Sequence, residues 1–210
     1  MTSAKDSLRE SGTKEKARES ILAAARKLFS EKGYHGTTIR EIAEERGILS
    51  GSLYAHIDSK EDLLFAIADE GANAFIDALT PVLEKDVSAA EKLRLGLAAH
   101  IGVIAHRLEA ARVFFHEWHA LGKERRQEIL EKRLSYEAMW DEILQQGISQ
   151  GEFSADGARF ARLLILSVAN WVYQWYSPNG SHSPEQIAHQ FSALILHGIA
   201  ANHEDKLGRR

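Results

Sequence analysis

Apolar side chains recur every three or four positions along most of the chain. This spacing places them on one face of an α-helix, whereas the alternating pattern of a half-buried strand is nearly absent. The first apolar stripe runs from Ile21 to Phe29. Gly33 follows it, at a position where a glycine typically ends a helix. The pattern predicts an all-α protein of about nine helices.

Several expected helices begin with side chains that can cap the free amides of a first turn. TIRE at residues 38–41 and SAAE at 88–91 have the form of a capping box. Ser183, Pro184 and Gln186 combine a cap, a proline at the first helical position and a capping glutamine. Pro81 should kink or end the helix that starts at SKED. Further helices are expected over about 124–150, 156–176 and 184–202, with frayed ends before residue 14 and after residue 202.

Two short helices with a tight turn between them are expected near the start of the chain. A helix over 38–46, a turn over 47–49 and a second helix over 50–56 have the layout of a helix-turn-helix, whose second helix enters the major groove of DNA. The segment GYHGTTIREIAEERGILSGSLYAHIDSKEDLL resembles the DNA-binding signature of TetR-type transcriptional regulators. The resemblance covers about residues 17–64 and rests on these residues: Gly33, Tyr34, Thr37, Thr38, Ile42, Ala43, Gly47, Gly51, Leu53, Tyr54, His56, Lys60, Glu61 and Leu63.

This resemblance implies two domains with different tasks. A three-helix DNA-binding domain with the helix-turn-helix would occupy residues 14–60, and a helical ligand-binding and dimerisation domain would occupy residues 61–203. The candidates for contacts with double-stranded DNA are Thr38, Arg40, Ser50, Gly51, Ser52, Tyr54, His56 and Lys60. A helix N-terminus such as that at Thr38 can bind a phosphate, and short serine hydroxyls suit base edges or bridging waters.

Two positions depart from the family pattern. Family members often have Ser and Lys where this chain has Leu49 and Ser50, so a cap hydroxyl and a basic contact are missing. Contacts from the second subunit are expected to compensate, together with the basic residues ahead of the first helix: Lys14, Lys16 and Arg18.

Charge restricts a DNA contact to the first part of the chain. The net charge is −4, but residues 1–64 carry 11 Lys and Arg against 11 Asp and Glu, whereas the remainder carries 15 against 19. The chain has no cysteine, its first 20 residues lack the apolar core of a secretory signal, and its longest apolar run is too short for a membrane span. We therefore expect a cytoplasmic protein without a membrane partner.

In the resembled family, the C-terminal part forms a homodimer, so a palindromic operator is expected. Two reading helices must lie about one DNA turn (~34 Å) apart, and a ligand that prefers another spacing weakens DNA binding. The last two expected helices are the dimer candidates because the run from Leu163 to Val168 is apolar around most of its circumference. The candidate residues are Leu164, Val168, Trp175, Phe191 and Ile195.

Aromatic residues concentrate in the second part of the chain, where an apolar effector site is expected. FFHEWHAL and the segments EKRLSYEAMWDEILQQGISQGEFS and ANWVYQWYSPNGSHSPEQIAHQFSALILHGI resemble a subgroup that often represses fatty-acid or sterol-ring degradation and is released by acyl-CoA esters. The resemblance implies an acyl chain among aromatic side chains and CoA phosphates near Arg107, Arg112 or Arg133. The candidate ligand residues are Phe114, Phe115, Trp118, Arg133, Tyr136, Trp140, Asn170, Trp171 and Gln174.

Three other functions compete with this hypothesis. HEWH at residues 116–119 has histidines three positions apart instead of the four that a zinc-protease helix needs, and no Gly-rich phosphate loop or nucleophile elbow is present, so no enzyme and no cofactor are expected. A sensor of lipophilic cations could use the same aromatic site with Glu117 or Glu137. A metal sensor would need several histidines to converge on one ion, and the candidates are His100, His106, His116 and His119. Single histidines on helices are more often surface or core groups, so no metal is expected.

Overall fold

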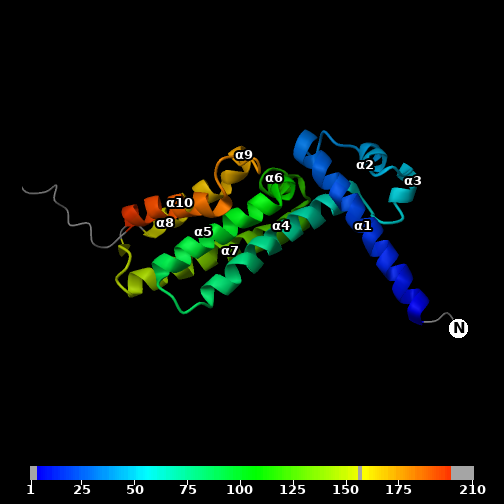
Figure 1. Ribbon diagram of the computed structural model, residues 1–210. Helices are drawn as coiled ribbons and strands as arrows, with labels where there is room; N and C mark the ends of the chain where they lie inside the picture. Colours follow the sequence, from blue (N-terminus) through cyan, green and yellow to red (C-terminus); the bar gives the residue numbers. More distant parts are fainter. Residues whose placement is uncertain (1–3, 156–157, 200–210) are drawn as a thin grey trace, which may run out of the picture. The chain divides into compact units, whose positions relative to one another are not determined.

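The computed structural model describes residues 4–155 and 158–199, and every element in this part of the chain is a helix (Figure 1). The all-α fold class is confirmed. None of the described helices has the length and apolarity that crossing a bilayer requires. The elements are α1 (Ala4–Lys32), α2 (Ile39–Arg46), α3 (Ser50–Leu53), α4 (Lys60–Leu83), α5 (Ala89–His106), α6 (Leu108–His116), the 3-10 helix η1 (Trp118–Ala120), α7 (Lys123–Ser149), α8 (Ala158–Asn170), α9 (Val172–Trp175) and α10 (Pro184–Ile199).

Three helices differ from the expected bounds. α1 begins at Ala4, so the expectation of a frayed segment up to residue 13 is wrong for the described residues. The helix expected over 156–176 is two helices, because the backbone breaks at Trp171 between α8 and α9. α3 ends at Leu53, and residues 54–56 form turns in place of the expected last helical turn. The predicted tail after residue 202 lies outside the described residues.

The chain divides into two compact units, and α4 and α7 contribute residues to both. Unit 1 comprises residues 1–72 and 109–130, and unit 2 comprises residues 73–108 and 131–210. The domain bounds 14–60 and 61–203 stay a prediction, and residues 200–203 lie outside the described part.

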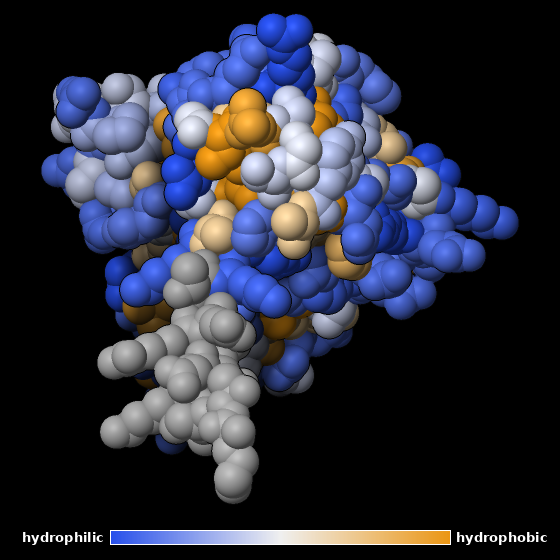
Figure 2. Space-filling model, turned by 90° about the vertical axis from the view of Figure 1, so that its right-hand side faces the viewer, coloured by the Kyte–Doolittle hydropathy of each residue, from blue (hydrophilic) through white to orange (hydrophobic). Residues whose placement is uncertain are grey.

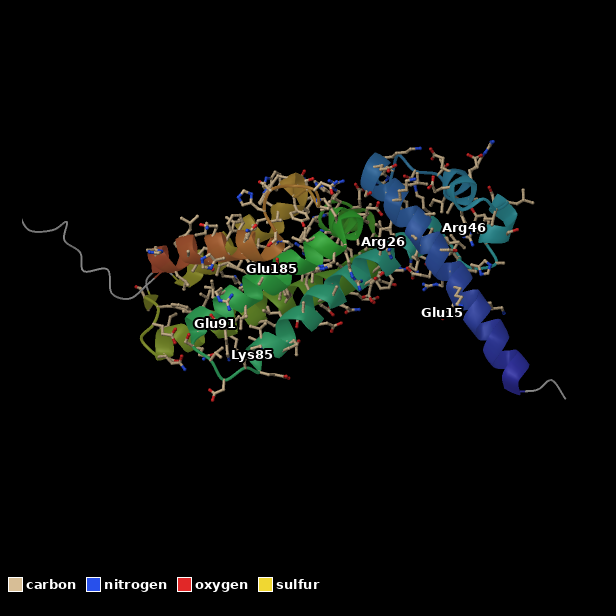
Figure 3. All side chains as sticks on the ribbon, viewed as in Figure 1. Glu15, Arg26, Arg46, Lys85, Glu91 and Glu185 are labelled. Carbon is tan, nitrogen blue, oxygen red and sulfur yellow. The ribbon has the colours of Figure 1, made fainter. Side chains whose placement is uncertain are left out.

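In unit 1, α1 packs against α2, and α2 packs against α3. Arg26 and Arg46 hold α1 against its neighbours (Figure 3). Nη2 of Arg26 lies 3.1 Å from Glu70 Oε2 on α4, and Nε of Arg46 at the end of α2 donates to Ser20 Oγ at 2.5 Å. Apolar side chains of α1, α2, α3 and the start of α4 form the core here: Ile21, Leu22, Ala25, Leu28, Phe29, Ile42, Ala43, Leu53, Leu63, Leu64 and Ile67.

In unit 2, α10 lies along α5 and also contacts α8 (Figure 1). Trp140 of α7 is fully buried, and α5 accommodates it at Gly96, where an added methyl group would lie 2.9 Å from Cη2 of Trp140. The N-terminus of α5 is capped twice. Ser88 Oγ accepts from the amide of Glu91 at 3.2 Å, and the carboxylate of Glu152 accepts from the amides of Ala89 and Ala90 at 3.1 and 3.0 Å.

Candidate nucleic-acid interface and effector region

The N-terminus of α2 has the capping box that the sequence predicts. Thr38 Oγ1 accepts from the amide of Glu41 at 3.2 Å, and Glu41 Oε2 accepts from the amide and the hydroxyl of Thr38 at 2.8 and 2.9 Å. Lys32 donates to the other carboxylate oxygen of Glu41 at 2.8 Å. The hydrogen bond from Lys32, followed by those from Thr38, lowers the pKa of Glu41 to about 2. A phosphate at Thr38 would therefore compete with a carboxylate that is ionised at neutral pH.

The turn between α2 and α3 depends on a left-handed glycine. Gly47 has φ 74° and donates to the carbonyl of Glu44 at 3.0 Å, while Ile48 donates to Ala43 at 3.0 Å. This pattern satisfies the last carbonyls of α2 and ends the helix. Leu49 then occupies the N-cap position of α3 in an extended conformation, and no side chain caps α3 there.

The surface of α3 is exposed except on one side. Leu53 is fully buried and packs α3 into unit 1, while Tyr54 is 56% exposed. Ser50 and His56 are half-buried, and Gly51 and Ser52 are exposed. The structure thus places five of the predicted DNA-contacting residues on α3 and the turn that follows it. Figure 2 views the molecule from the side on which α3 lies in Figure 1, and this face is mostly hydrophilic, with several separate hydrophobic areas.

Lys60 makes contacts inside the protein that its predicted role did not include. Its Nζ donates to the carbonyls of Tyr34 and Thr37 at 2.9 and 2.8 Å and lies 4.2 Å from the centroid of the Tyr34 ring. These bonds fix the loop that joins α1 to α2 and therefore orient the helix-turn-helix. The remaining predicted residue, Arg40, is highly exposed and donates from Nε to Glu44 at 2.8 Å.

The segment from α6 to the start of α7 is attached to the DNA-binding helices within unit 1. Glu117 Oε2 accepts from the amide of Tyr34 at 3.0 Å, and Glu61 Oε1 accepts from the amide of Gly122 at 3.0 Å. Arg125 pairs with Asp62 in the first turn of α4. The sequence suggested Glu117 only as one of two acidic residues for the alternative of a cation sensor, and these contacts were not predicted because the partners are distant along the chain.

The predicted effector residues divide between the two units. In unit 1, Phe114 is buried beside Gly71, where an added methyl would lie 3.1 Å from Phe114 Cβ, and its ring centroid is 5.1 Å from that of Phe115. Trp118 is also buried. In unit 2, the side chains range from buried to exposed: Tyr136 and Trp140 are buried, Arg133 and Asn170 are half-buried, and Trp171 and Gln174 are exposed.

A polar cluster lies inside unit 2, around a histidine that is 1% exposed. Nδ1 of His100 lies 2.8 Å from the hydroxyl of Tyr136, and the ring centroid of Phe75 is 4.6 Å away. Burial lowers the pKa of His100 to about 3, against a smaller opposing effect of the Ala169 backbone. Burial also raises the pKa of Tyr136 and lowers that of Arg133, where nearby Glu137 opposes the effect. His100 is therefore a neutral hydrogen-bonding group at physiological pH.

Metal-binding geometry is lacking in the described part of the chain, which contains no cluster of three His, Asp or Glu side chains that could hold an ion. Two of the four histidines considered for a metal sensor have other partners: His100 bonds to Tyr136, and His106 bonds to the carbonyl of Gly102 at 2.7 Å. No described site favours the metal-sensor alternative.

Several large apolar side chains of unit 2 are exposed. They follow helical spacing along α8 and α9, and Leu194 of α10 is 72% exposed. Of the predicted dimer residues, Leu164 and Trp175 are exposed, Val168 and Phe191 are half-buried, and Ile195 is buried within the unit. Phe160, which sequence reasoning did not name, belongs to the same set. The exposed residues are Phe160, Leu163, Leu164, Trp171, Trp175 and Leu194.

Comparison with known proteins places both parts of the chain in one family. Residues 21–67 match the model of bacterial regulatory proteins of the tetR family, and residues 86–199 match the tetracyclin repressor-like C-terminal domain. The HTH-type transcriptional repressor KstR2 of Mycolicibacterium smegmatis is 31% identical over 191 residues, which are 90% of this chain and 93% of the relative.

Two further similar proteins have names that refer to a metabolic role or to a bound ligand. The fatty acid metabolism regulator protein of Bacillus subtilis is 28% identical over 85% of this chain and 93% of its own length. The crystal structure of AibR in complex with isovaleryl coenzyme A and operator DNA superposes with a TM-score of 0.77 at 27% identity, covering 85% of this chain and 97% of AibR. Together with the helix-turn-helix geometry, these matches show that the chain belongs to the TetR family and is a DNA-binding transcriptional repressor, not an enzyme.

Proposed function

We propose that this repressor controls genes of lipid or acyl-CoA metabolism and that an acyl-CoA releases it from its operator. The observation that carries the proposal is the likeness to AibR, solved with isovaleryl coenzyme A and operator DNA, over 85% of the chain. The names of two relatives, KstR2 and the fatty acid metabolism regulator protein, support the same class of regulated genes.

The chain's own side chains suit an acyl-CoA. Within unit 2, Tyr136 and Trp140 of α7 supply buried aromatic side chains, the surroundings that an acyl chain would need. Arg133 is a guanidinium whose pKa is lowered by burial, so a nearby anionic group of the ligand would stabilise its charged form. Release requires only that the acyl-CoA bind more tightly to a state whose reading helices are wrongly spaced.

A homodimer in the cytoplasm is part of the proposal. The exposed apolar side chains of α8, α9 and α10 form a surface that a second copy of the chain would cover, with the two pairs of long helices forming a four-helix interface. Light scattering during gel filtration should then give twice the 23.4 kDa mass of one chain. A mass of one chain at micromolar concentration would contradict the dimer.

A gel shift on the DNA upstream of the protein's own gene tests the effector. We expect the shift to weaken steeply with salt, because phosphate contacts release counterions. Medium- or long-chain acyl-CoA should abolish the shift and raise the melting temperature of the protein, whereas free coenzyme A and cationic dyes should do neither. Stabilisation by cationic dyes alone would indicate a multidrug sensor. If no acyl-CoA changes the gel shift, an acyl-CoA is not the effector.

A further inference from the structure

Leu49 stands out on the surface that reads DNA. It is 80% exposed, whereas the other large aliphatic side chains between residues 47 and 59 are half-buried at Ile48 or buried at Leu53 and Ile57. It is also the N-cap residue of α3, where Ser, Thr, Asp or Asn would bind a free amide and where leucine binds none. Neither the core nor the cap of α3 explains a leucine here.

The composition of the reading segment restricts which bases it can recognise. Residues 47–59, GILSGSLYAHIDS, contain no Lys or Arg for guanine and no Asn or Gln for adenine. Serine hydroxyls can bond to several bases and discriminate weakly. Two other features of the major-groove code could still be read here: Asp58 could accept from the N4 amino group of cytosine, and an exposed apolar side chain could contact the 5-methyl group of thymine.

The position of Leu49 fits this contact. In a helix-turn-helix, residues at the N-terminal end of the second helix meet the base edges. Leu49 immediately precedes α3, and the exposed Gly51 follows two residues later, where an added methyl would meet nothing within 4 Å. The three residues that follow Leu49, Ser50 to Ser52, are small, so Leu49 is the largest exposed side chain at the start of α3. We infer that Leu49 is a specificity-determining residue that recognises the methyl group of a thymine in each operator half-site.

The test compares duplexes with and without that methyl group. Wild-type full-length protein first selects duplexes from a random-sequence pool, and the selected DNA is then resynthesised with deoxyuridine replacing one symmetric pair of thymidines at a time. We expect one position in each half-site at which loss of the methyl weakens binding about fourfold per half-site. Leu49→Ala should bind the thymidine and deoxyuridine duplexes equally at that position. Leu134→Ala, which truncates a leucine of α7 that is 54% exposed, should discriminate like the wild type.

Leu49→Ser separates recognition from folding. Serine can cap α3, so this variant should be at least as stable as the wild type and should still lose the methyl discrimination. The inference is overturned if wild-type protein tolerates deoxyuridine at every position, or if both Leu49 variants keep the wild-type preference. It depends on DNA binding alone and is independent of the acyl-CoA proposal, since no effector is present in any arm of the experiment.

Discussion

Acidification from about pH 7.5 to about pH 5 is expected to lower the free energy of unfolding by about 2 kcal/mol per chain through His100 alone. Burial lowers the pKa of this imidazole from 6.5 to about 3 in the folded protein. Below pH 6.5 the unfolded chain binds a proton at His100, while the folded chain does not. The stabilisation is therefore complete above about pH 6.5 and is lost as the pH falls towards 3.

The surroundings of His100 explain why the folded state resists protonation. The ring lies beside Phe75 and bonds to Tyr136, whose own pKa is raised by burial, so that hydroxyl stays neutral over this range. The Ala169 backbone favours the charged ring, but burial has the larger effect. A charged imidazolium in this apolar core would need a counter-ion that the cluster does not provide.

Urea unfolding at several pH values and one protein concentration measures this contribution. His100→Gln can still bond to Tyr136 but cannot titrate, so it should lose about 2 kcal/mol less than the wild type over the same interval. His106→Gln, an exposed position on the same helix, should follow the wild type. Tyr136→Phe keeps the imidazole buried and should keep the pH dependence. Equal losses in wild type and His100→Gln would mean that His100 is protonated in the folded protein.

Local features of the fold could be predicted because their causes lie within a few residues. The capping box at Thr38 and Glu41 and the cap at Ser88 need only the spacing of a hydroxyl from an amide three residues on. Gly33 and Gly47 end helices with positive φ values of 77° and 74°. Such signals, together with helical periodicity, were enough for the fold class and for the position of the helix-turn-helix.

Contacts between distant residues could not be predicted in this way. Lys60 was assigned to DNA on its charge, yet its Nζ bonds to carbonyls 23 and 26 positions earlier. Glu117 bonds to an amide 83 positions away, and the pairing of His100 with Tyr136 spans 36. Each depends on how helices pack in space, for which the spacing of residue types along the chain carries no signal.

The break at Trp171 illustrates the same limit within one predicted helix. Apolar periodicity continues across it, so a single helix over 156–176 was expected. In the structure, the amide of Trp171 still bonds to Ser167 at 3.3 Å, and the amide of Gln174 bonds to Trp171 in a tighter, three-residue turn. The backbone hydrogen bonds change from spanning four residues to spanning three, and this change leaves the hydrophobic pattern of the sequence almost unchanged.

Replacing Gly51 by alanine is expected to raise the stability of the folded protein and to lower its affinity for the operator. An added methyl at Gly51 meets nothing within 4 Å, and the residue is exposed in a helical segment without positive φ. Alanine should therefore raise the free energy of unfolding by about 0.5–1 kcal/mol, since glycine loses more backbone freedom on folding. In the same variant, we expect affinity for the operator to fall about tenfold, or about 1.4 kcal/mol.

The loss of affinity follows from the direction of the new methyl group. Gly51 precedes the buried Leu53 by two residues, a rotation of about 200°, so its free side lies opposite the core. That side would enter the major groove, where a glycine lets the backbone approach the DNA closely. Denaturation curves and gel shifts on one duplex give both quantities.

Gly102→Ala is the matched control for Gly51→Ala. Gly102 lies in α5 of unit 2, and a methyl there also meets nothing within 4 Å. It should bring a similar gain in stability with no change in DNA affinity. If Gly51→Ala binds the operator as tightly as Gly102→Ala, the exposed side of α3 does not approach the DNA, and another element must read the operator. If both variants lose affinity, the cause is increased rigidity of the chain and not a clash at α3.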